Sequence, residues 1–392
     1  MIAALVVGLG MGVALLAVRP SSSVAQPAAV SASAPLTGQP FTFTKSTQPD
    51  PVAEYEPAVV YNMVDKEFLA VWTNQRPFAD DDIYAQRVSA NGKLLSWFAV
   101  NQAAPAGERG EVAVAYNHHH NDYLIVYTRY DSSSASTELR GRRASYQGPQ
   151  GDEFVIAYTT TNASEPTIAF NDQQDEFLVA WRQSGASHME IWGRRVAGEA
   201  GTGIGGSEFH NSAQELTAPL ARDCYSPDLA YHLYRNEYVL AFTYESATDA
   251  NVYVRLVTAA GVYSVGQQVI INVKADSPAI AANADADQYL IVYRNLDGTG
   301  GSSDIWAYTL PGDFSGAVHG AIVQGTTNMK EPDVAQMRDT DLYQIVWTEW
   351  PSTEDVKGMR MDSNRNLGDQ FSVSASSNFY EFEPVVADGS PL

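Results

Sequence analysis

A unit of short apolar strands recurs along this chain with a period of tens of residues. Its first copy reads EPAVVYN at 56–62, EFLAVW at 67–72 and DIYAQRV at 82–88. The unit occurs six times in full, and its first strand returns once more at 383–387. No segment keeps apolar residues at helical spacing, so the repeat predicts a closed ring of small sheets rather than a helical solenoid. The equivalent positions, about 51 to 61 residues apart, are Pro57, Val112, Pro166, Pro227, Pro278, Pro332 and Pro384.

Each unit contains four expected strands. The first strands are expected at 57–62, 112–117, 166–171, 227–232, 278–283, 332–337 and 384–388. The second strands are expected at 67–72, 122–127, 176–181, 237–242, 288–293 and 342–347. These second strands are apolar at consecutive positions, which is typical of strands buried on both faces. Such burial is expected where each sheet packs between two neighbours.

The strand count leaves more than one arrangement open. Six complete four-stranded repeats plus a partial one predict an all-β fold, a β-propeller with six or seven blades. An extra strand, FTFT at 41–44, precedes the first unit. Pairing of the two ends would close the ring and hide sheet edges, around either a seventh blade or a six-bladed ring with spare strands. Truncation of a longer gene would also leave an unmatched strand.

The repeated motifs E-[FY]-L-x-V-[WY] and D-I-[YW]-x-x-R-V resemble those of bacterial secreted β-propeller repeat proteins. The resemblance covers about 41–387. The fourth unit departs from it with Arg255-Leu256 in place of the Arg-Val pair, and the fifth has Tyr308-Thr309 there. The resemblance implies an architecture and leaves the activity open, because propellers carry many unrelated functions.

The first 34 residues differ from the rest of the chain. No charged side chain occurs before Arg19, and a Ser-, Ala- and Pro-rich stretch follows with Ala32-Ser33-Ala34 as a small-residue cleavage pattern. We interpret 1–34 as a signal peptide or, alternatively, an uncleaved N-terminal anchor. The remaining segment, 35–392, is expected to form a single propeller domain. The protein is therefore expected to be secreted or held at the cell surface.

Charge and cysteine content exclude several classes of function. The net charge is −22, so the surface repels nucleic acid and anionic membranes. The single cysteine, Cys224, permits no intramolecular disulfide. No P-loop, HExxH, GxSxG or paired-cysteine motif is present, so no nucleotide or other cofactor is implied.

Glutamate recurs immediately before the first strand. If these strands line the axis, symmetry would place the side chains in a ring, where they could contact sugar hydroxyls or hold a hard cation such as calcium. The alternative is that each glutamate bonds a neighbouring blade and belongs to the scaffold. The residues in this position are Glu56, Glu111, Glu165, Glu331 and Glu383, and Ser226 and Ser277 replace them in two units.

Four other features of the sequence bear on possible sites. Trp350 lies outside the repeat pattern and is the best candidate for an exposed aromatic that stacks on a ligand. The triplet at 118–120, His-His-His, is interpreted as a solvated loop, because three consecutive residues rarely converge on one ion. The loop at 283–287 is interpreted as an Asx-rich turn rather than a calcium loop, since it lacks the distal Glu. The recurring third-strand arginines, such as Arg87, are expected to form structural ion pairs. No metal site is predicted.

Three functions fit these observations. The first in order is a non-catalytic binding module for a glycan or a protein, built on a rigid scaffold with variable loops. The second is a glycan-active enzyme, a polysaccharide lyase or glycoside hydrolase with its site at the mouth of the ring. The third is a structural subunit that assembles by pairing of its terminal strands.

Overall fold

The computed structural model describes residues 2–7, 53–75, 82–101, 109–131, 136–157, 162–245, 249–271, 274–298, 301–338, 340–350, 355–373 and 381–389. These residues form strands and one short 3-10 helix, η1 (Ile204–Gly206). Within these ranges no helix is long and apolar enough to cross a membrane.

Six four-stranded antiparallel sheets form the blades of the structure. Blade 1 contains β2 (Ala53–Asn62), β3 (Glu67–Gln75), β4 (Asp82–Ser89) and β5 (Leu94–Ala99). Blade 2 contains β6 (Arg109–Asn117), β7 (Asp122–Asp131), β8 (Ser136–Ser145) and β9 (Gly148–Ala157). Blade 3 contains β10 (Ser164–Asn171), β11 (Glu176–Ser184), β12 (Met189–Ala197) and β13 (Gln214–Glu215). Blade 4 contains β14 (Cys224–His232), β15 (Glu237–Glu245), β16 (Ala250–Thr258) and β17 (Tyr263–Ile271). Blade 5 contains β18 (Ala275–Asn283), β19 (Gln288–Asn295), β20 (Asp304–Pro311) and β21 (Val318–Val323). Blade 6 contains β22 (Asn328–Met337), β23 (Leu342–Trp350), β24 (Asp355–Asp362) and β25 (Phe371–Ser372).

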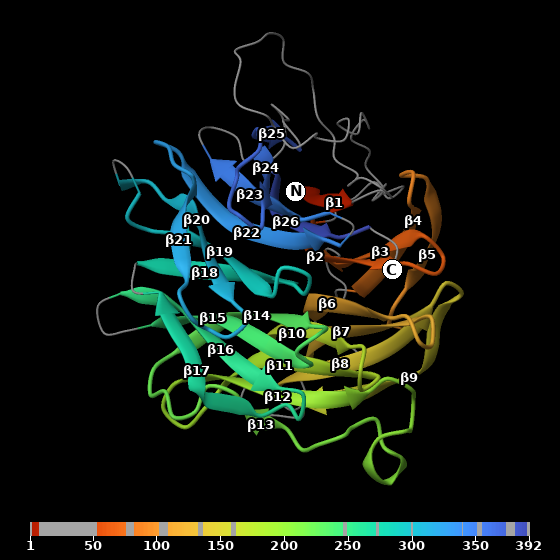
Figure 1. Cartoon of the computed structure of the whole chain (residues 1–392). Coiled ribbons are helices and arrows are strands. Elements are labelled where there is room, and N and C mark those ends of the chain that lie inside the picture. The colour runs from red at the N-terminus through yellow and green to blue at the C-terminus, as the bar shows by residue number, and fades with distance from the viewer. Residues whose placement is uncertain are drawn as a thin grey trace.

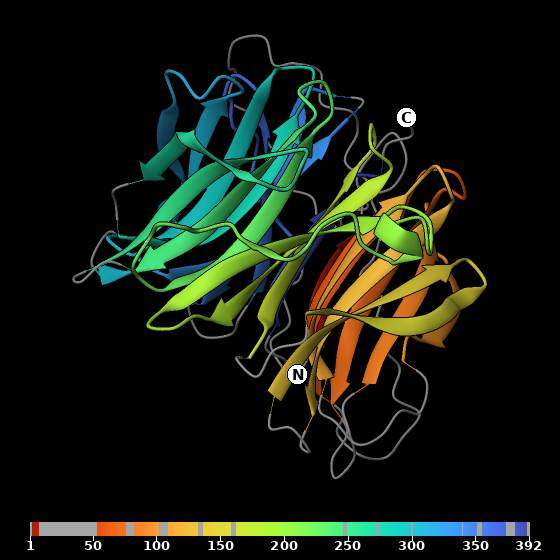
Figure 2. The ribbon, with the colours of Figure 1, turned by 90° about the horizontal axis from the view of Figure 1, so that it is seen from below.

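The blades follow one another around the ring in chain order (Figure 1). Figure 2 shows blades 1 and 2, in orange and yellow, on one side and blades 4 and 5, in green and cyan, on the other. The predicted all-β propeller is therefore confirmed, with six blades. Within the described residues no further four-stranded sheet is present, and the extra strand expected at 41–44 lies outside them.

The last strand completes the ring of inner strands without forming a full blade. Strand β26 (Glu381–Ala387) pairs in parallel with β1 (Ile2–Val7) in a two-stranded sheet. Val386 packs in the apolar cluster of blade 6, and Ala387 packs with Tyr61 and Phe68 of blade 1. Strand β26 therefore lies between blades 6 and 1, where Figure 1 places it.

Every inner strand carries a bulge at the repeated Glu or Ser residue, which is followed by proline in six of the seven strands and by Val112 in blade 2. Glu56 has a φ of 52°, and the pairing of β2 with β3 shifts between Tyr55 and Ala58. Proline has no N–H to donate to the ladder, so a bulge is where a strand accommodates it. The inner strands begin before the bulge, and the prediction that they start at the proline was wrong for that reason. The bulge residues with positive φ are Glu56, Glu111, Glu165, Ser226, Ser277, Glu331 and Glu383.

The apolar core lies between consecutive blades. Side chains of the second strands are fully buried, as expected, for example Phe68 and Leu69 at 0% exposure. One cluster joins Val71 and Ile83 of blade 1 to Tyr123 of blade 2, and equivalent clusters join the later pairs of blades. This packing fixes the inner strands side by side, so their two ends form two opposite polar rims. We call them the bulge end and the turn end, the latter at the hairpins between inner and second strands.

Candidate functional site

The five glutamates predicted from the repeat lie together at the bulge end of the ring. Each side chain accepts a hydrogen bond from the backbone N–H of the equivalent residue in the next inner strand. The acceptor and donor pairs are Glu331 with Glu383 (3.0 Å), Glu383 with Glu56 (2.8 Å), Glu56 with Glu111, Glu111 with Glu165 (2.6 Å) and Glu165 with Ser226 (2.5 Å). The ring expected from symmetry is present, and these contacts join neighbouring strands as the scaffold alternative requires. A role in ligand binding stays a prediction.

Burial changes the protonation of this ring. It raises the pKa of Glu56 to about 8, and the neighbouring charges of Glu111 and Glu383 add to the effect. Burial also raises the pKa of Glu111 and of Glu383. A carboxyl group with a pKa near 8 is mostly protonated at neutral pH. The ring therefore carries less negative charge than its number of glutamates suggests.

The ring is interrupted in blades 4 and 5. Ser226 and Ser277 occupy the bulge positions there, and neither carries a carboxylate. The backbone N–H of Ser277 donates instead to the hydroxyl of Thr243 at 3.2 Å. Two consecutive blades thus lack the acidic side chain that links the others.

Two arginines occupy second-strand positions beside the interruption. The equivalent positions in the other four blades hold threonine, and blades 3 and 5 hold Arg182 and Arg294. Arg294 makes a bidentate ion pair with Asp276, with Nε 2.6 Å from Oδ1. Arg182 pairs with Glu165, and its guanidinium carbon lies 5.9 Å from the ring centre of Tyr225. Asp276 and Glu165 therefore each have a cationic partner.

Two aspartates on the inner strands are the third departure from the repeat. Asp228 and Asp333 directly follow the bulge proline, where the other inner strands have alanine, threonine or valine. One carboxylate oxygen of Asp228 accepts the N–H of Ile280 at 2.8 Å, and one of Asp333 accepts the N–H of Val386 at 2.6 Å. Thr167 also donates its hydroxyl to Asp228, at 3.2 Å. Both aspartates thus bridge from their own strand to the next.

Burial gives these two aspartates unusual acidities. It raises the pKa of Asp228 to about 6. It raises the pKa of Asp333 to about 7, and the charge of Asp228 contributes. The charge of Asp228 therefore acts on Asp333, and both pKa values lie near neutral pH. Sequence reasoning missed them, although an acid in a position that is small in the other units was a signal available from the repeat register.

We call this region the interrupted sector. It is the part of the bulge end in blades 3 to 6 where the repeat is broken. Its residues are Glu165, Arg182, Tyr225, Ser226, Asp228, Asp276, Ser277, Arg294 and Asp333.

Trp350 lies at the end of β23, at the same end of the ring. Half of its surface is exposed (50%), which confirms the expectation of an exposed aromatic. The ammonium of Lys330 lies 5.5 Å from its ring centre and 3.4 Å from Glu331. Trp97 is exposed as well. Of these two tryptophans, Trp350 is the one linked to the glutamate ring, because Lys330 contacts both its ring and Glu331.

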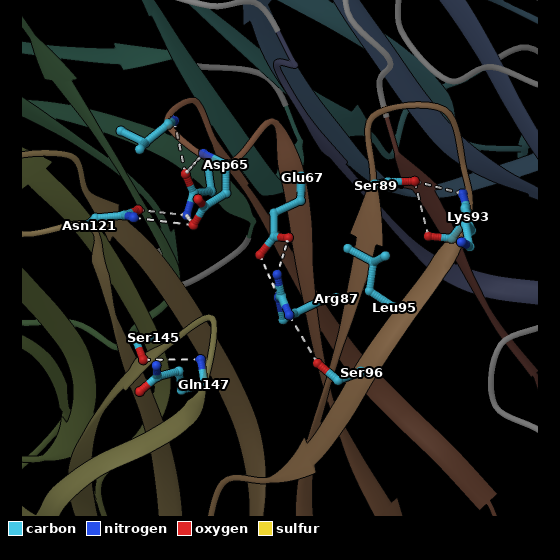
Figure 3. Close-up of polar contacts among 12 residues, drawn as sticks. Asp65, Glu67, Arg87, Ser89, Lys93, Leu95, Ser96, Asn121, Ser145 and Gln147 are labelled. Carbon is cyan, nitrogen blue, oxygen red and sulfur yellow. Dashed lines mark hydrogen bonds and ion pairs between the residues drawn. The ribbon is translucent and has the colours of Figure 1, made fainter.

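Two of the third-strand arginines, Arg87 and Arg195, form structural ion pairs, as predicted. Arg87 donates two hydrogen bonds of 2.6 Å to Glu67 at the start of β3 (Figure 3). Arg195 makes the equivalent pair with Glu176, at 2.7 and 2.6 Å. Arg360 has no acid in this position and donates to Gln344 at 3.3 Å. These contacts hold strands within a blade and leave the interrupted sector untouched.

The turn end is held by contacts between hairpins of neighbouring blades. The amide of Asn62 donates to Asn121 at 2.9 Å, and Asn121 donates to Asp65 at 3.2 Å (Figure 3). The predicted turn at 283–287 is confirmed, since the N–H of Ala286 donates to the Asn283 side chain at 3.0 Å. Asp287 of this turn pairs with Arg235.

The histidine triplet also lies at the turn end, and it is not simply solvated. His118 and His119 both contact Asp172 of the next blade, and His120 contacts Asp175. The triplet lies on a loop as predicted, and His119 and His120 are exposed, but its contacts with carboxylates of a hairpin more than fifty residues away in sequence were not expected.

Comparison with known proteins gives a fold and no family. No protein-family model matches the chain, and no curated protein matches it in sequence. Two solved structures of the α-L-arabinofuranosidase of Fusarium graminearum, one with an iminosugar inhibitor and one with arabinobiose, each have a TM-score of 0.51. They are 13% and 12% identical to this chain, and each alignment covers 79% of this chain and 93% of the enzyme. A thermostable family-43 glycoside hydrolase aligns with a TM-score of 0.42 and 11% identity, over 70% of this chain and 95% of that one. At these identities the likeness shows the fold.

The comparisons correct the order of functions set out from the sequence. That order placed a non-catalytic binding module first and a glycan-active enzyme second. The two Fusarium structures are of an α-L-arabinofuranosidase, and the glycan-active enzyme is therefore the function that is taken up as a proposal below.

Proposed function

We propose that this protein is a glycan-active enzyme, a glycoside hydrolase whose site is the interrupted sector. The observation that carries the proposal is that three departures from the repeat coincide at one end of neighbouring blades. Arginine replaces threonine, serine replaces glutamate, and aspartate replaces a small residue. A scaffold contact is repeated in every blade, whereas a site for one asymmetric substrate requires such departures.

The carboxyl groups of this sector fall into two chemical kinds. Asp333, with a pKa of about 7, and Asp228, with a pKa of about 6, can hold a proton near neutral pH. Asp276 and Glu165 are each paired with an arginine. Glycoside hydrolysis requires one carboxyl group of each kind, an acid that protonates the leaving oxygen and a carboxylate that acts as base or nucleophile. We assign the acid to Asp333 and the carboxylate to Asp276.

The substrate expected here is a neutral glycan. The net charge of −22 disfavours polyanionic chains. Trp350, half exposed at the same end of the ring, offers an aromatic side chain on which a sugar can stack. The shared fold with the Fusarium arabinofuranosidase supports a hydrolase over a lyase. We further propose that the protein acts outside the cell, secreted or at the surface, since its first 34 residues have the composition of an export signal.

A glycan screen tests the proposed activity. The purified chain is incubated with arabinan, xylan and other neutral polysaccharides and with a panel of aryl glycosides, and new reducing ends and unsaturated ends are followed separately. New reducing ends without unsaturated ends are expected. Unsaturated ends would identify a lyase instead.

Variants then locate the activity in the sector. Asp333→Asn should lower kcat/KM by at least about 100-fold, the usual contribution of a general acid. Asp313→Asn, in a surface turn where Asp313 bonds only its neighbour Ser315, serves as the control and should keep full activity. Melting temperatures of all variants show whether the fold is retained. If a folded Asp333→Asn variant released sugar as fast as the wild type, the assignment of Asp333 as the general acid would be refuted.

A further inference from the structure

Two hairpin turns bring two imidazoles and a carboxylate together at the turn end. His118 and His119 lie on the turn between β6 and β7, and Asp172 lies on the turn between β10 and β11. The Nε2 atom of His118 is 2.7 Å from Oδ1 of Asp172, and that of His119 is 3.3 Å from the same oxygen. His119 Nε2 also lies 2.9 Å from the backbone oxygen of Asp172. Both imidazoles thus converge on one residue of the next blade.

The spacing of these atoms fits a single metal ion. The three candidate ligand atoms all lie within 4.8 Å of one another. Bonds of about 2.0–2.2 Å to nitrogen and oxygen place the ligands of a tetrahedral zinc ion roughly 3.3–3.5 Å apart. A small outward movement of the Asp172 carboxylate would therefore admit an ion.

The surrounding structure holds both imidazoles in place. Phe170 packs edge-on against the ring of His118, at 5.6 Å between ring centres, and lies 5.9 Å from the ring of His119. The two imidazole centres are 4.3 Å apart. The side chain of Asn117 accepts the backbone N–H of His119 at 2.8 Å, which fixes the turn. The ligands are therefore positioned before any ion arrives.

We propose that His118, His119 and Asp172 form a binding site for one divalent transition-metal ion, zinc foremost, that bridges blades 2 and 3. Two imidazoles with one carboxylate suit zinc, copper or nickel better than calcium or magnesium, which prefer oxygen ligands. Water completes the coordination. The site lies at the turn end, remote from the interrupted sector, so it does not depend on the proposed hydrolase activity.

Two other histidines provide matched controls. His120 lies next to the ligands but turns to Asp175, at 2.6 Å, in a separate contact. His188 lies near Glu190 in blade 3, at the bulge end of the ring. Substitution of either one removes an imidazole of similar exposure and leaves the three proposed ligands in place.

The test is a titration of the full-length chain, prepared without a polyhistidine tag and treated with EDTA, with Co²⁺ followed by visible absorption and with Zn²⁺ followed by calorimetry. One ion should bind per chain, and the Co²⁺ complex should show the intense visible bands of four-coordinate cobalt. His118→Gln, His119→Gln and Asp172→Asn should each weaken binding at least about tenfold. His120→Gln and His188→Gln should change it less than about threefold.

Stability measurements separate binding from folding. Melting temperatures in EDTA show whether each variant folds as the wild type does. Zinc should raise the melting temperature of the wild type and of the control variants, because the ligands come together only in the folded chain. Absence of saturable binding, or binding that survives in folded Asp172→Asn, would overturn the proposal. Loss of binding in His120→Gln that equals the loss in His118→Gln would overturn this ligand set.

Discussion

The side chain of Glu383 accepts a hydrogen bond of 2.8 Å from the backbone N–H of Glu56, which lies 327 residues earlier in the chain. This bond joins the last inner strand to the first. Glu383 is itself held by Glu331 through the next bond of the ring. The glutamate ring therefore continues across the junction between the two ends of the chain.

We predict that Glu383→Ala destabilises the protein by about 1–3 kcal/mol, because the N–H of Glu56 loses its acceptor in a partly buried place. Glu383→Gln keeps a carbonyl oxygen as acceptor and should cost less than about 1 kcal/mol. Urea unfolding measures both. Glu199→Ala, at an exposed loop position, is the control. Equal stability of the alanine variant and the wild type would show that the hydrogen bond between Glu56 and Glu383 does not stabilise the closure of the ring.

The raised pKa values predict a protein that is more stable in mild acid than in mild base. Glu56 with a pKa of about 8, Asp333 with about 7 and Asp228 with about 6 bind protons more tightly in the folded state. Their contribution is complete below about pH 4, the unfolded value, and is lost as pH rises through 6 to 8. His118 and His232 act in the opposite sense near pH 6.5, because burial lowers their pKa values.

We expect the free energy of unfolding to fall, on the order of a few kcal/mol, between pH 5 and pH 8.5, since the carboxyl groups outweigh the two histidines. Glu56→Gln should flatten this dependence, because the amide cannot ionise. Urea unfolding at several pH values gives both slopes. A wild-type stability that increases over this range would contradict the raised pKa values of Glu56, Asp228 and Asp333.

The repeat predicted the architecture well because its signal is local. The consecutive apolar residues of each second strand, such as Phe68 and Leu69, require burial on both faces wherever they fold. The start of the inner strands was placed too late for a different reason. Pro57 looks like a strand boundary in sequence, and only the pairing with β3 shows that it sits in a bulge within a longer strand.

The candidate sites were harder to predict because their partners are distant in sequence. In the sequence, Asp228 looks like any surface acid. Only its hydrogen bond from the N–H of Ile280 in the next blade shows that it lies between two inner strands. His118 looks solvated until Asp172 is seen beside it. Composition and spacing carry no information on such contacts, which depend on how consecutive blades pack.

The ion pair of Glu176 predicts a large loss of stability when one partner is removed. Glu176 is fully buried, accepts two hydrogen bonds from Arg195 and lies 3.1 Å from His210. Glu176→Gln should cost about 3 kcal/mol, because it leaves the arginine without its counter-charge. Lys274→Ala, which removes an exposed ion pair with Asp297, should cost less than about 0.5 kcal/mol. Similar losses in the two variants would show that burial does not strengthen the Glu176 pair.

The last prediction concerns the pH dependence of the proposed hydrolase. If protonated Asp333 is the general acid, kcat/KM should fall on the alkaline side with an apparent pKa near 7. The negative charge of Asp228 contributes to that raised pKa. Asp228→Asn removes this charge, so the pKa of Asp333 should decrease and the alkaline limb should move to lower pH.

The measurement is the pH profile of kcat/KM for the wild type and the Asp228→Asn variant on the substrate found in the glycan screen. Asp285→Asn, at the turn end, is the matched control and should leave the limb in place, since it removes the same charge far from Asp333. A limb that stays fixed or moves to higher pH in Asp228→Asn would show that Asp333 is not the acid. The two aspartates would then be structural bridges between inner strands, the role that their hydrogen bonds to Ile280 and Val386 already serve.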